Sequence, residues 1–248
     1  MVNRLNTHFL PRLLDPKALG GSSVVVIDVL RASTTIISAL SAGARTVYPC
    51  REVSEALRIA GQLESAVVLG GEREGLRIEG FHLGNSPSEY TSEVVDGKHI
   101  VFTTTNGTLA MESCRMADRV LVGAFANQST VVEYLATQPQ VDLVCAGTHG
   151  EVTREDVLFA GAVVAGLRRS TTTMNDASRL ARDAWCHLES APPEMLTKAL
   201  RDSQGGRNLV KIGHAADIAY AAQVDTTNLL PELDLGNWQI HRQPQQPT

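Results

Sequence analysis

The 248-residue sequence predicts a three-layer α/β/α fold with a mainly parallel sheet and a helical C-terminal portion. Three observations support this: short apolar runs rich in β-branched residues, segments of helical spacing between them, and the loss of such runs after about residue 169. Strands that alternate with helices form a parallel sheet, because each crossover helix packs back onto one face of it. The N-terminal part of the chain is therefore expected to supply the sheet.

Six runs are predicted to be buried strands because they are short, apolar and bounded by polar or glycine-rich segments. They are residues 24–27, 46–48, 66–69, 99–103, 119–122 and 141–145. Apolar spacing and capping residues predict helices between and after these strands. The helices are residues 33–42, 54–63, 105–114, 129–136 and 157–167, and another is expected to begin at Ser86-Pro87.

The C-terminal portion of about 170–225 is predicted to be helical at 175–188, 193–202 and 208–223, with a short strand following at 238–240. No long linker separates this portion from the sheet, so residues 1–248 are predicted to form a single α/β domain. Its apolar residues are expected to complete the core, with a homodimer face as the alternative. These residues are Leu196, Leu200, Leu209 and Ile212.

The composition argues against several classes of protein. A net charge of −5 and a pI near 5.8 disfavour a nucleic-acid binder, which needs a basic surface. No apolar run is long enough to span a membrane or to form a signal peptide, so a cytoplasmic location is expected. The four cysteines contain no C-x-x-C pair, which argues against a zinc site. Arg154 is the first arginine after Cys145, too far along for a cysteine-phosphatase loop.

Ligands of open parallel sheets bind beyond the carboxyl ends of the strands, where loops and helix amino ends converge. Four of the six predicted strands run into polar or glycine-rich segments, at residues 28–31, 70–75, 103–108 and 146–150. These segments are expected to meet in a single ligand site.

One of these segments is a candidate anion-binding loop. Its residues are Thr104, Thr105, Asn106, Gly107 and Thr108. Hydroxyl groups and free backbone N–H groups at the start of a helix favour a bound phosphate. Ordinary N-capping by a threonine is the alternative interpretation. Gly147 and Thr148 form a second candidate, for which a common turn is the alternative.

Acidic residues in the same regions suggest a magnesium site. The candidate ligands are Asp28, Glu72, Glu155 and Asp156. Mg²⁺ prefers oxygen ligands, and binding it would relieve the mutual repulsion of clustered carboxylates. Each acid taken singly is explained equally well as a solvated side chain or a helix cap.

Basic side chains in these loops are candidates for holding an oxyanion. Arg31, Arg73 and Arg77 can bind phosphate through two parallel hydrogen bonds, although surface arginines are common. His82 and His149 are candidate proton donors to a leaving oxygen, with a structural role as the alternative.

Two common phosphate-binding motifs are absent from the sequence. It contains neither G-x-x-x-x-G-K-[ST] nor G-x-G-x-x-G, so nucleotide hydrolysis and dinucleotide redox chemistry lack their usual support. Asp28 after a strand is typical of enzymes that form an aspartyl phosphate. Those enzymes commonly carry a second acid two residues later, where this chain has Leu30.

Several longer segments match one known family in the same order. They are residues 27–35 (IDVLRASTT), 71–73 (GER), 80–87 (GFHLGNSP), 104–108 (TTNGT), 155–158 (EDVL), 160–161 (AG) and 206–209 (GRNL), followed by Gly213 and Asp217. Through them the sequence resembles the 2-phosphosulfolactate phosphatases from about residue 24 to residue 217. The resemblance implies a layered α/β fold, a requirement for Mg²⁺, and hydrolysis of 2-phospho-3-sulfolactate to 3-sulfolactate and phosphate on a route to coenzyme M.

The expected substrate suggests roles for particular residues, which the matching positions do not themselves reveal. Arg31, Arg73 and Arg207 would meet the carboxylate and sulfonate of the substrate, and Asn85 and Ser86 would belong to the substrate site. We expect direct attack by a water molecule that an acid such as Asp28 or Glu72 orients, with a phospho-Asp28 intermediate as the rival mechanism. A phosphatase for another small anionic phosphate and a non-catalytic binder of organic phosphates or sulfonates are the alternative functions.

Overall fold

The fold was analysed in a computed structural model, which describes residues 2–167 and 172–243. The described residues form an 11-stranded sheet. In sheet order the strands are β5 (Leu76–Arg77), β4 (Val67–Arg73), β6 (His99–Thr103), β3 (Thr46–Cys50), β11 (Gln239–Arg242), β10 (Pro231–Asp234), β7 (Arg119–Gly123), β2 (Ser23–Ile27), β8 (Gln140–Cys145), β1 (Arg4–His8) and β9 (Thr173–Met174). The predicted α/β class with a mainly parallel sheet is confirmed.

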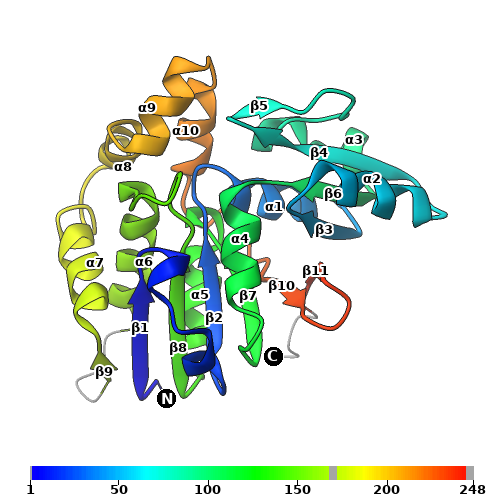
Figure 1. Ribbon diagram of the computed structural model, residues 1–248. Coiled ribbons are helices and arrows are strands. Elements are labelled where there is room, and N and C mark those ends of the chain that lie inside the picture. Colours follow the sequence, from blue (N-terminus) through cyan, green and yellow to red (C-terminus); the bar gives the residue numbers. More distant parts are fainter. Residues whose placement is uncertain (1, 168–171, 244–248) are drawn as a thin grey trace.

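Ten α-helices lie within the described residues (Figure 1). They are α1 (Ala32–Ser41), α2 (Val53–Gln62), α3 (Ser92–Val95), α4 (Asn106–Ser113), α5 (Gln128–Leu135), α6 (Arg154–Gly166), α7 (Asp176–Cys186), α8 (Pro193–Arg201), α9 (Gln204–Lys211) and α10 (Ala215–Ala221). Short 3-10 helices occupy Pro11–Leu13, Pro16–Leu19, Pro87–Glu89 and Phe125–Asn127. Part of the expected C-terminal portion, residues 170 and 171, lies outside the described residues, as do residues 1, 168, 169 and 244–248 of the expected domain.

The sheet consists of two parallel blocks joined by an antiparallel hairpin. The first block is β4-β6-β3 and the second is β7-β2-β8-β1-β9. The hairpin β10–β11 pairs antiparallel with β7 on one side and with β3 on the other, so the two blocks run in opposite senses. Figure 1 shows β4 and β6 lying across the direction of β2 and β8. In a flat sheet opposite senses would put the carboxyl ends of the two blocks at opposite edges. Because the blocks cross, residues that follow β2 and β8 and residues at the ends of β4 and β6 line one cavity.

Both faces of the central strands are buried. Val25 and Ile27 of β2 pack into one core with α5, α6 and the C-terminal helices, whereas Val24 and Val26 pack into a second core with α1 and α4. A third, smaller core lies beneath α2 and includes Leu69. Side chains alternate across a strand, so a strand covered on both faces is apolar throughout. This is why the continuous apolar runs predicted the strands correctly.

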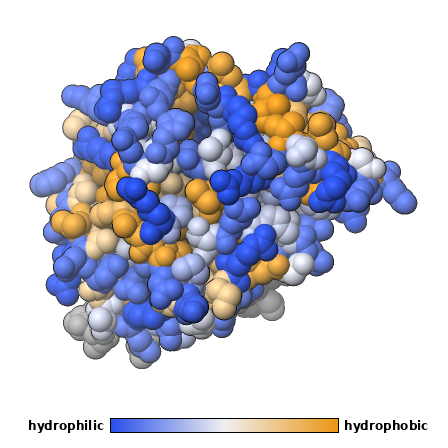
Figure 2. Space-filling model, viewed as in Figure 1, coloured by the Kyte–Doolittle hydropathy of each residue, from blue (hydrophilic) through white to orange (hydrophobic). Residues whose placement is uncertain are grey.

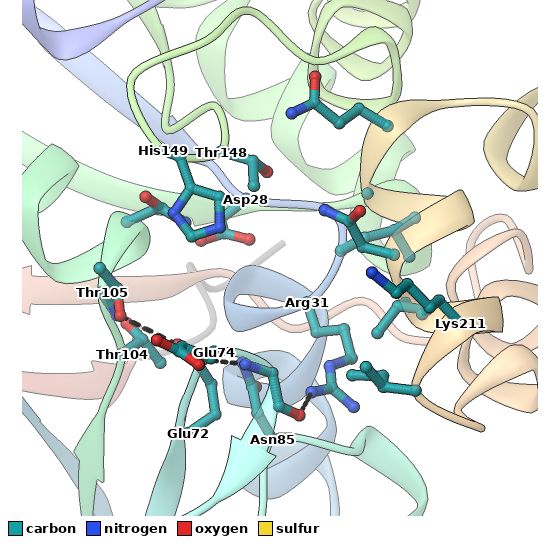
Figure 3. A pocket seen from close by; sticks show the side chains of 18 residues that line it. Asp28, Arg31, Glu72, Glu74, Asn85, Thr104, Thr105, Thr148, His149 and Lys211 are labelled. Atoms are coloured by element: carbon teal, nitrogen blue, oxygen red, sulfur yellow. Dashed lines mark hydrogen bonds between the residues drawn. The ribbon is translucent and has the colours of Figure 1, made fainter.

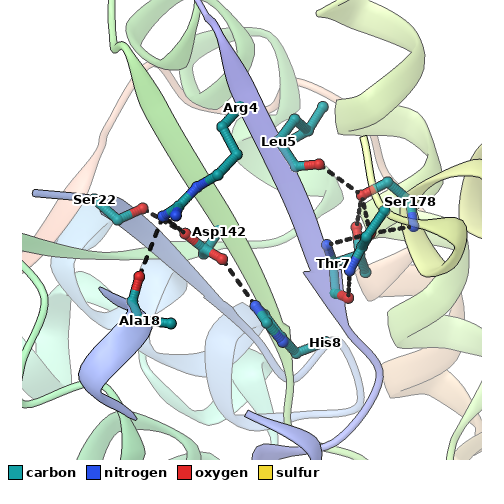
Figure 4. Close-up of polar contacts among 9 residues, drawn as sticks. Arg4, Leu5, Thr7, His8, Ala18, Ser22, Asp142 and Ser178 are labelled. Carbon is teal, nitrogen blue, oxygen red and sulfur yellow. Dashed lines mark hydrogen bonds and ion pairs between the residues drawn. The ribbon is translucent and has the colours of Figure 1, made fainter. Parts of the chain in front are cut away.

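Polar hydrogen bonds hold the N-terminal strand β1, which apolar patterning does not predict. Asp142 on β8 is buried and accepts hydrogen bonds from Ser22 Oγ at 2.6 Å and Arg4 Nη2 at 3.3 Å, and it pairs with His8 Nε2 at 2.8 Å (Figure 4). Burial acts to raise the pKa of Asp142, but the hydrogen bonds from His8 and Ser22 outweigh it and lower that pKa. The network joins both ends of β1 to β8 and to the residue that precedes β2.

Four expectations about element boundaries were wrong. The third predicted strand does not end at residue 69, because β4 continues through Gly70 and Gly71 to Arg73. A β-carbon on Gly71 would lie 2.1 Å from the Thr103 carbonyl oxygen, so these glycines permit close strand pairing rather than a loop. The segment at Ser86-Pro87 forms only a 3-10 turn, and residues 208–223 contain two helices, α9 and α10, that Gly213 separates at φ 85°. The C-terminal portion of about 170–225 is not wholly helical, because it contains the two-residue strand β9. The strand predicted at 238–240 overlaps β11, whereas β10 was not predicted.

Three of the four apolar residues singled out in the C-terminal helices have the expected core role. Leu196, Leu200 and Leu209 are buried in the core around α6, and Ile212 packs against it. The remaining surface is mixed: Figure 2 shows apolar residues in several separate patches among hydrophilic ones. No helix among the described residues is long and apolar enough to span a bilayer.

Candidate functional site

A cavity of about 470 Å³ lies where the carboxyl ends of the two blocks meet (Figure 3). Its lining residues are Asp28, Leu30, Arg31, Glu72, Glu74, Gly75, Asn85, Thr104, Thr105, Asn106, Thr148, His149, Gln204, Gly205, Asn208, Leu209, Lys211 and Ile212. All four polar strand ends identified in the sequence contribute to this lining. The structure thus brings together segments that are far apart in the chain.

Asp28 follows β2 and is only 8% exposed. Its Oδ1 accepts a hydrogen bond from the Ala32 N–H at 3.2 Å, at the start of α1. Within the described part of the chain, no hydrogen bond reaches Oδ2. Burial raises the pKa of Asp28 from 3.8 to about 7, with further contributions from the negative charges of Glu72 and Glu155. A buried carboxylate with one free oxygen and acidic neighbours is suited to meeting a cation.

Glu72 comes from β4, in the opposite block, and lies on the cavity wall facing Asp28. Its Oε2 accepts a hydrogen bond from the Gly75 N–H at 2.8 Å. Its Oε1 accepts bonds from the N–H and the hydroxyl of Thr105, at 3.3 and 3.4 Å. These bonds fix the carboxylate and join the β4–β5 turn to the start of α4.

The other two candidate metal ligands lie outside the cavity lining. Asp156 is buried and accepts hydrogen bonds from the Val29 N–H at 2.9 Å and the Gly147 N–H at 3.0 Å, so it ties together the loops after β2 and β8. Glu155 is 1% exposed, and its Oε2 has no hydrogen-bond partner among the described residues. Burial raises the pKa values of both acids, and their mutual repulsion raises that of Asp156 further.

A metal site built from three or more acidic, histidine or cysteine side chains is not found among residues 2–167 and 172–243. Magnesium does not require one, because it usually keeps several waters and binds one or two carboxylates together with substrate phosphate. Asp28 and Glu72, both buried and both on the cavity wall, fit that smaller ligand set. A cation between them would offset the repulsion that helps to raise the pKa of Asp28.

The expected anion-binding loop divides into two roles. The Thr104 hydroxyl accepts a hydrogen bond from the Thr108 N–H at 3.3 Å and contacts the Thr108 hydroxyl at 3.1 Å, which is the capping role. Thr105 and Asn106 line the cavity at the amino end of α4, where backbone N–H groups favour an anion. Gly107 allows α4 to approach the acid, because a β-carbon there would lie 3.0 Å from Asp28 Oδ2.

The loop after β8 also divides into structural and cavity-lining residues. Gly147 lies outside the cavity lining. Its φ of 65° and the hydrogen bond from its N–H to Asp156 show that it shapes the turn after β8. Thr148 and His149 line the same cavity as Asp28 (Figure 3). The other candidate histidine, His82, accepts a hydrogen bond from the Leu69 N–H through Nδ1 at 2.9 Å, which is a structural contact.

Of the four candidate arginines, only Arg31 lines the cavity. The Arg73 guanidinium binds the carbonyl oxygens of Glu72 and Arg51, and that of Arg77 binds the His82 carbonyl oxygen. Arg207 is exposed and binds the Asp202 carbonyl oxygen. These three side chains therefore lie outside the lining.

Arg31 itself is held firmly by the protein. It is 4% exposed, and its Nη1 donates to Asp217 Oδ2 at 2.7 Å, while its Nη2 donates to the Gly75 carbonyl oxygen at 2.8 Å. The expected substrate residue Ser86 also lies outside the lining and donates to Asp217 Oδ1 at 2.6 Å. Asn85 does line the cavity, and its Oδ1 is buried without a partner among the described residues.

Sequence reasoning missed the wall that α9 contributes. Gln204, Asn208 and Lys211 line the cavity, and their spacing of four and three residues places them on one helix face. Glu74 at the β4–β5 turn was also missed as a lining residue. A polar stripe on a short C-terminal helix has no signature of its own, since its position depends on how the helix packs.

Comparison with known proteins places the chain in one family. A family model described as 2-phosphosulpholactate phosphatase matches residues 8–236. A "probable 2-phosphosulfolactate phosphatase" of Symbiobacterium thermophilum is 41% identical over 218 residues, covering 86% of this chain and 91% of the relative. Relatives with the same description in Thermotoga petrophila and Caldanaerobacter subterraneus subsp. tengcongensis are 39% and 36% identical, covering 85% and 94% of this chain and 88% and 96% of their own lengths. The chain belongs to the 2-phosphosulpholactate phosphatase family.

Proposed function

We propose that the cavity hydrolyses 2-phospho-3-sulfolactate to 3-sulfolactate and phosphate, with Mg²⁺ as the cofactor. The observation that carries this proposal is the convergence of two buried carboxylates, Asp28 and Glu72, with the exposed ammonium of Lys211 around one cavity. A substrate that bears phosphate, sulfonate and carboxylate groups requires such a mixture of charges. The names of the relatives agree with this substrate.

Magnesium held by Asp28 and Glu72 would neutralise phosphate oxygens and stabilise the charge that develops on them. The amino end of α4 would bind the same phosphate through the backbone N–H groups of Asn106 and Gly107. The amide of Asn85 supplies a further polar group on this wall. The phosphate would therefore lie between β4, the loop after β2 and α4.

In this proposal Asp28 orients the attacking water and accepts its proton. The water oxygen forms a bond to phosphorus while the bond from phosphorus to the ester oxygen on carbon 2 of the substrate breaks. His149, an exposed residue of the same lining, gives a proton to that departing oxygen. The products are the free 2-hydroxy acid and inorganic phosphate, and solvent restores the two side chains.

A phospho-Asp28 intermediate is the rival mechanism, because the free Oδ2 could also attack phosphorus. The configuration at phosphorus, followed with a substrate made chiral there, separates the two. Direct attack by water is a single displacement and inverts the configuration, whereas formation and hydrolysis of an aspartyl phosphate by two displacements at phosphorus retain it. Trapping of a phosphorylated enzyme during turnover would overturn the water mechanism.

The proposed function is tested by measuring phosphate release from 2-phospho-3-sulfolactate with Mg²⁺ and with a chelator. A panel of 2-phospholactate, phosphoglycerates and sugar phosphates is measured beside it. We expect magnesium-dependent release of phosphate that is fastest with the sulfonated substrate. Faster release from another member of the panel would reassign the substrate, and binding without release from any of them would indicate a non-catalytic binder.

A further inference from the structure

Of the two positively charged side chains that line the cavity, only one has charge available for a ligand. Arg31 and Lys211 are the two lysine or arginine side chains among the lining residues. The charge of Arg31 is balanced by the buried Asp217 at 2.7 Å, and both its terminal nitrogens donate to protein groups. Arg31 is therefore a fixed part of the wall with little charge to spare for a ligand.

Lys211 differs from Arg31 in each of these respects. It is the last residue of α9, its side chain is exposed, and no ion pair or hydrogen bond of its ammonium is found in the described part of the chain. Figure 3 shows Lys211 reaching from α9 toward the cavity, on the side opposite Thr105 and Glu72. Attraction to the carboxyl end of α9 favours a cation at this position. That attraction does not account for an ammonium that points over the cavity.

The neighbours of Lys211 on the same helix face are also hydrogen-bond donors. Gln204 and Asn208 line the cavity with it. The Gln204 amide nitrogen already donates one hydrogen bond to Glu151 Oε2 at 3.2 Å, so Gln204 has one N–H left for a ligand, beside the Asn208 amide and the Lys211 ammonium. The opposite wall carries Asp28 and Glu72, the carboxylates assigned to the cation and the phosphate. The cavity therefore has an acidic wall and a basic wall, which matches a ligand with two separate anionic groups.

We infer that the α9 face of Gln204, Asn208 and Lys211 binds the sulfonate of the substrate, and that Lys211 determines the preference for a sulfonated phosphate ester. This inference rests on the proposed function, because it takes the acidic wall as the phosphate side. A related phosphate ester that lacks the sulfonate would leave Lys211 without a partner in the enzyme–substrate complex.

The test compares kcat/KM for 2-phospho-3-sulfolactate and 2-phospholactate in the wild type, Lys211→Met and Arg207→Met. Arg207 is the matched control, since it lies on α9 one turn earlier, is exposed and does not line the cavity. Lys211→Met should lower kcat/KM for the sulfonated substrate roughly tenfold to a hundredfold, mainly through KM, because a charge-assisted hydrogen bond is lost. Its kcat/KM for 2-phospholactate should stay near the wild-type value.

Lys211→Arg should recover part of the preference, and Arg207→Met should leave it intact. Equal losses for both substrates, or no loss for either, would overturn the inference. Calorimetric binding of 3-sulfolactate against lactate gives a second readout that needs no catalysis. If the wild type releases no phosphate but binds 3-sulfolactate through Lys211, the proposed function fails and the inference stands. If Lys211→Met binds 3-sulfolactate as well as the wild type does, the inference fails.

Discussion

At the scale of single residues, the site depends on which atoms the protein leaves unpaired. Asp28 Oδ2 accepts no hydrogen bond within the described part of the chain, whereas both oxygens of Glu72 and of Asp156 accept backbone hydrogen bonds. Asp156 consequently holds loops in place, and Asp28 is available for chemistry. The same residue type thus has different roles according to its hydrogen bonds and burial.

His149→Gln tests the proton donor at this scale. The variant should lower kcat for 2-phospho-3-sulfolactate by roughly a hundredfold to ten-thousandfold, because an alkoxide leaves poorly without a proton. For p-nitrophenyl phosphate the loss should be only a few-fold, since nitrophenolate leaves without protonation. Steady-state kinetics on both substrates provide the measurement. A similar loss on both would assign His149 to positioning or binding instead.

Gly107→Ala tests how closely α4 must approach Asp28. The added methyl would lie 2.9 Å from the Ala32 β-carbon and 3.0 Å from Asp28 Oδ2, so the carboxylate must move. We expect a folded protein with activity lowered roughly a hundredfold. Gly61→Ala on α2 is the control, because nothing lies within 4 Å of its added methyl. Wild-type activity in Gly107→Ala would show that Asp28 does not need its present position.

At the scale of elements, one buried ion pair joins the C-terminal helices to the loop after β2. Arg31 and Asp217 are 3% and 4% exposed in their side chains and 2.7 Å apart, and Ser86 donates to the same carboxylate. A buried pair contributes little net stability when it is intact, but losing one partner leaves an uncompensated charge. The pair therefore fixes where α10, and α9 before it, sits over the cavity.

Asp217→Ala should lower the free energy of unfolding by about 3–5 kcal/mol, since it strands the buried Arg31 guanidinium. The double variant with Arg31→Met should regain part of that stability while remaining inactive. Glu232→Ala removes the partner of Arg119 in a more exposed pair and should cost about 1 kcal/mol or less. Urea denaturation of the four proteins gives these values. If Asp217→Ala and Glu232→Ala lowered the free energy of unfolding equally, this role of the buried pair would be contradicted.

The elements that the sequence predicts well are those buried on both faces. Residues 24–27 and 141–145 are apolar throughout, so their pattern is complete without knowledge of neighbours. Strand β1 has a polar sequence and depends on Asp142 and Ser178, which are distant in the chain. Strand β10 depends on pairing with β7. Such contacts cannot be inferred from local periodicity, which explains why these strands were missed.

The same distinction applies to the candidate site. Strand ends correctly identify Asp28, Glu72, Thr105 and Thr148 as cavity residues, because sheet topology alone places them. The loop positions of Arg73, Arg77 and Arg207 suggested that they would line the cavity. Their guanidinium groups instead bind nearby backbone carbonyl oxygens, which the sequence does not reveal. Lys211 was missed because its place depends on the packing of α9.

At the scale of the whole molecule, the acids between the two blocks oppose folding when they are charged. Burial raises the pKa of Asp28 from 3.8 to about 7, so the folded chain holds this proton more tightly than the unfolded chain does. The resulting contribution to stability is complete below the unfolded pKa and is lost as the pH rises through the folded pKa. Glu155 and Asp156 act in the same direction.

Without a divalent cation, the melting temperature should therefore fall as the pH rises from about 4 to about 7, the window set by the two pKa values of Asp28. Asp28→Asn should show a smaller fall and a higher melting temperature at neutral pH, because the buried charge is gone. Added Mg²⁺ should raise the melting temperature of the wild type more than that of the variant. Thermal denaturation in chelator and in Mg²⁺ checks this, and a pH dependence unchanged by Asp28→Asn would refute it.

We infer that the carboxyl ends of the two opposed parallel blocks together form one cation site. Calorimetric titration with Mn²⁺, as a substitute for Mg²⁺, tests this in the wild type, Asp28→Asn, Glu72→Gln and Glu155→Gln. We expect a single site in the wild type, its loss in each of the first two variants, and its retention in Glu155→Gln, since Glu155 lies outside the cavity lining. Binding that survives both Asp28→Asn and Glu72→Gln would show that the cation site lies elsewhere.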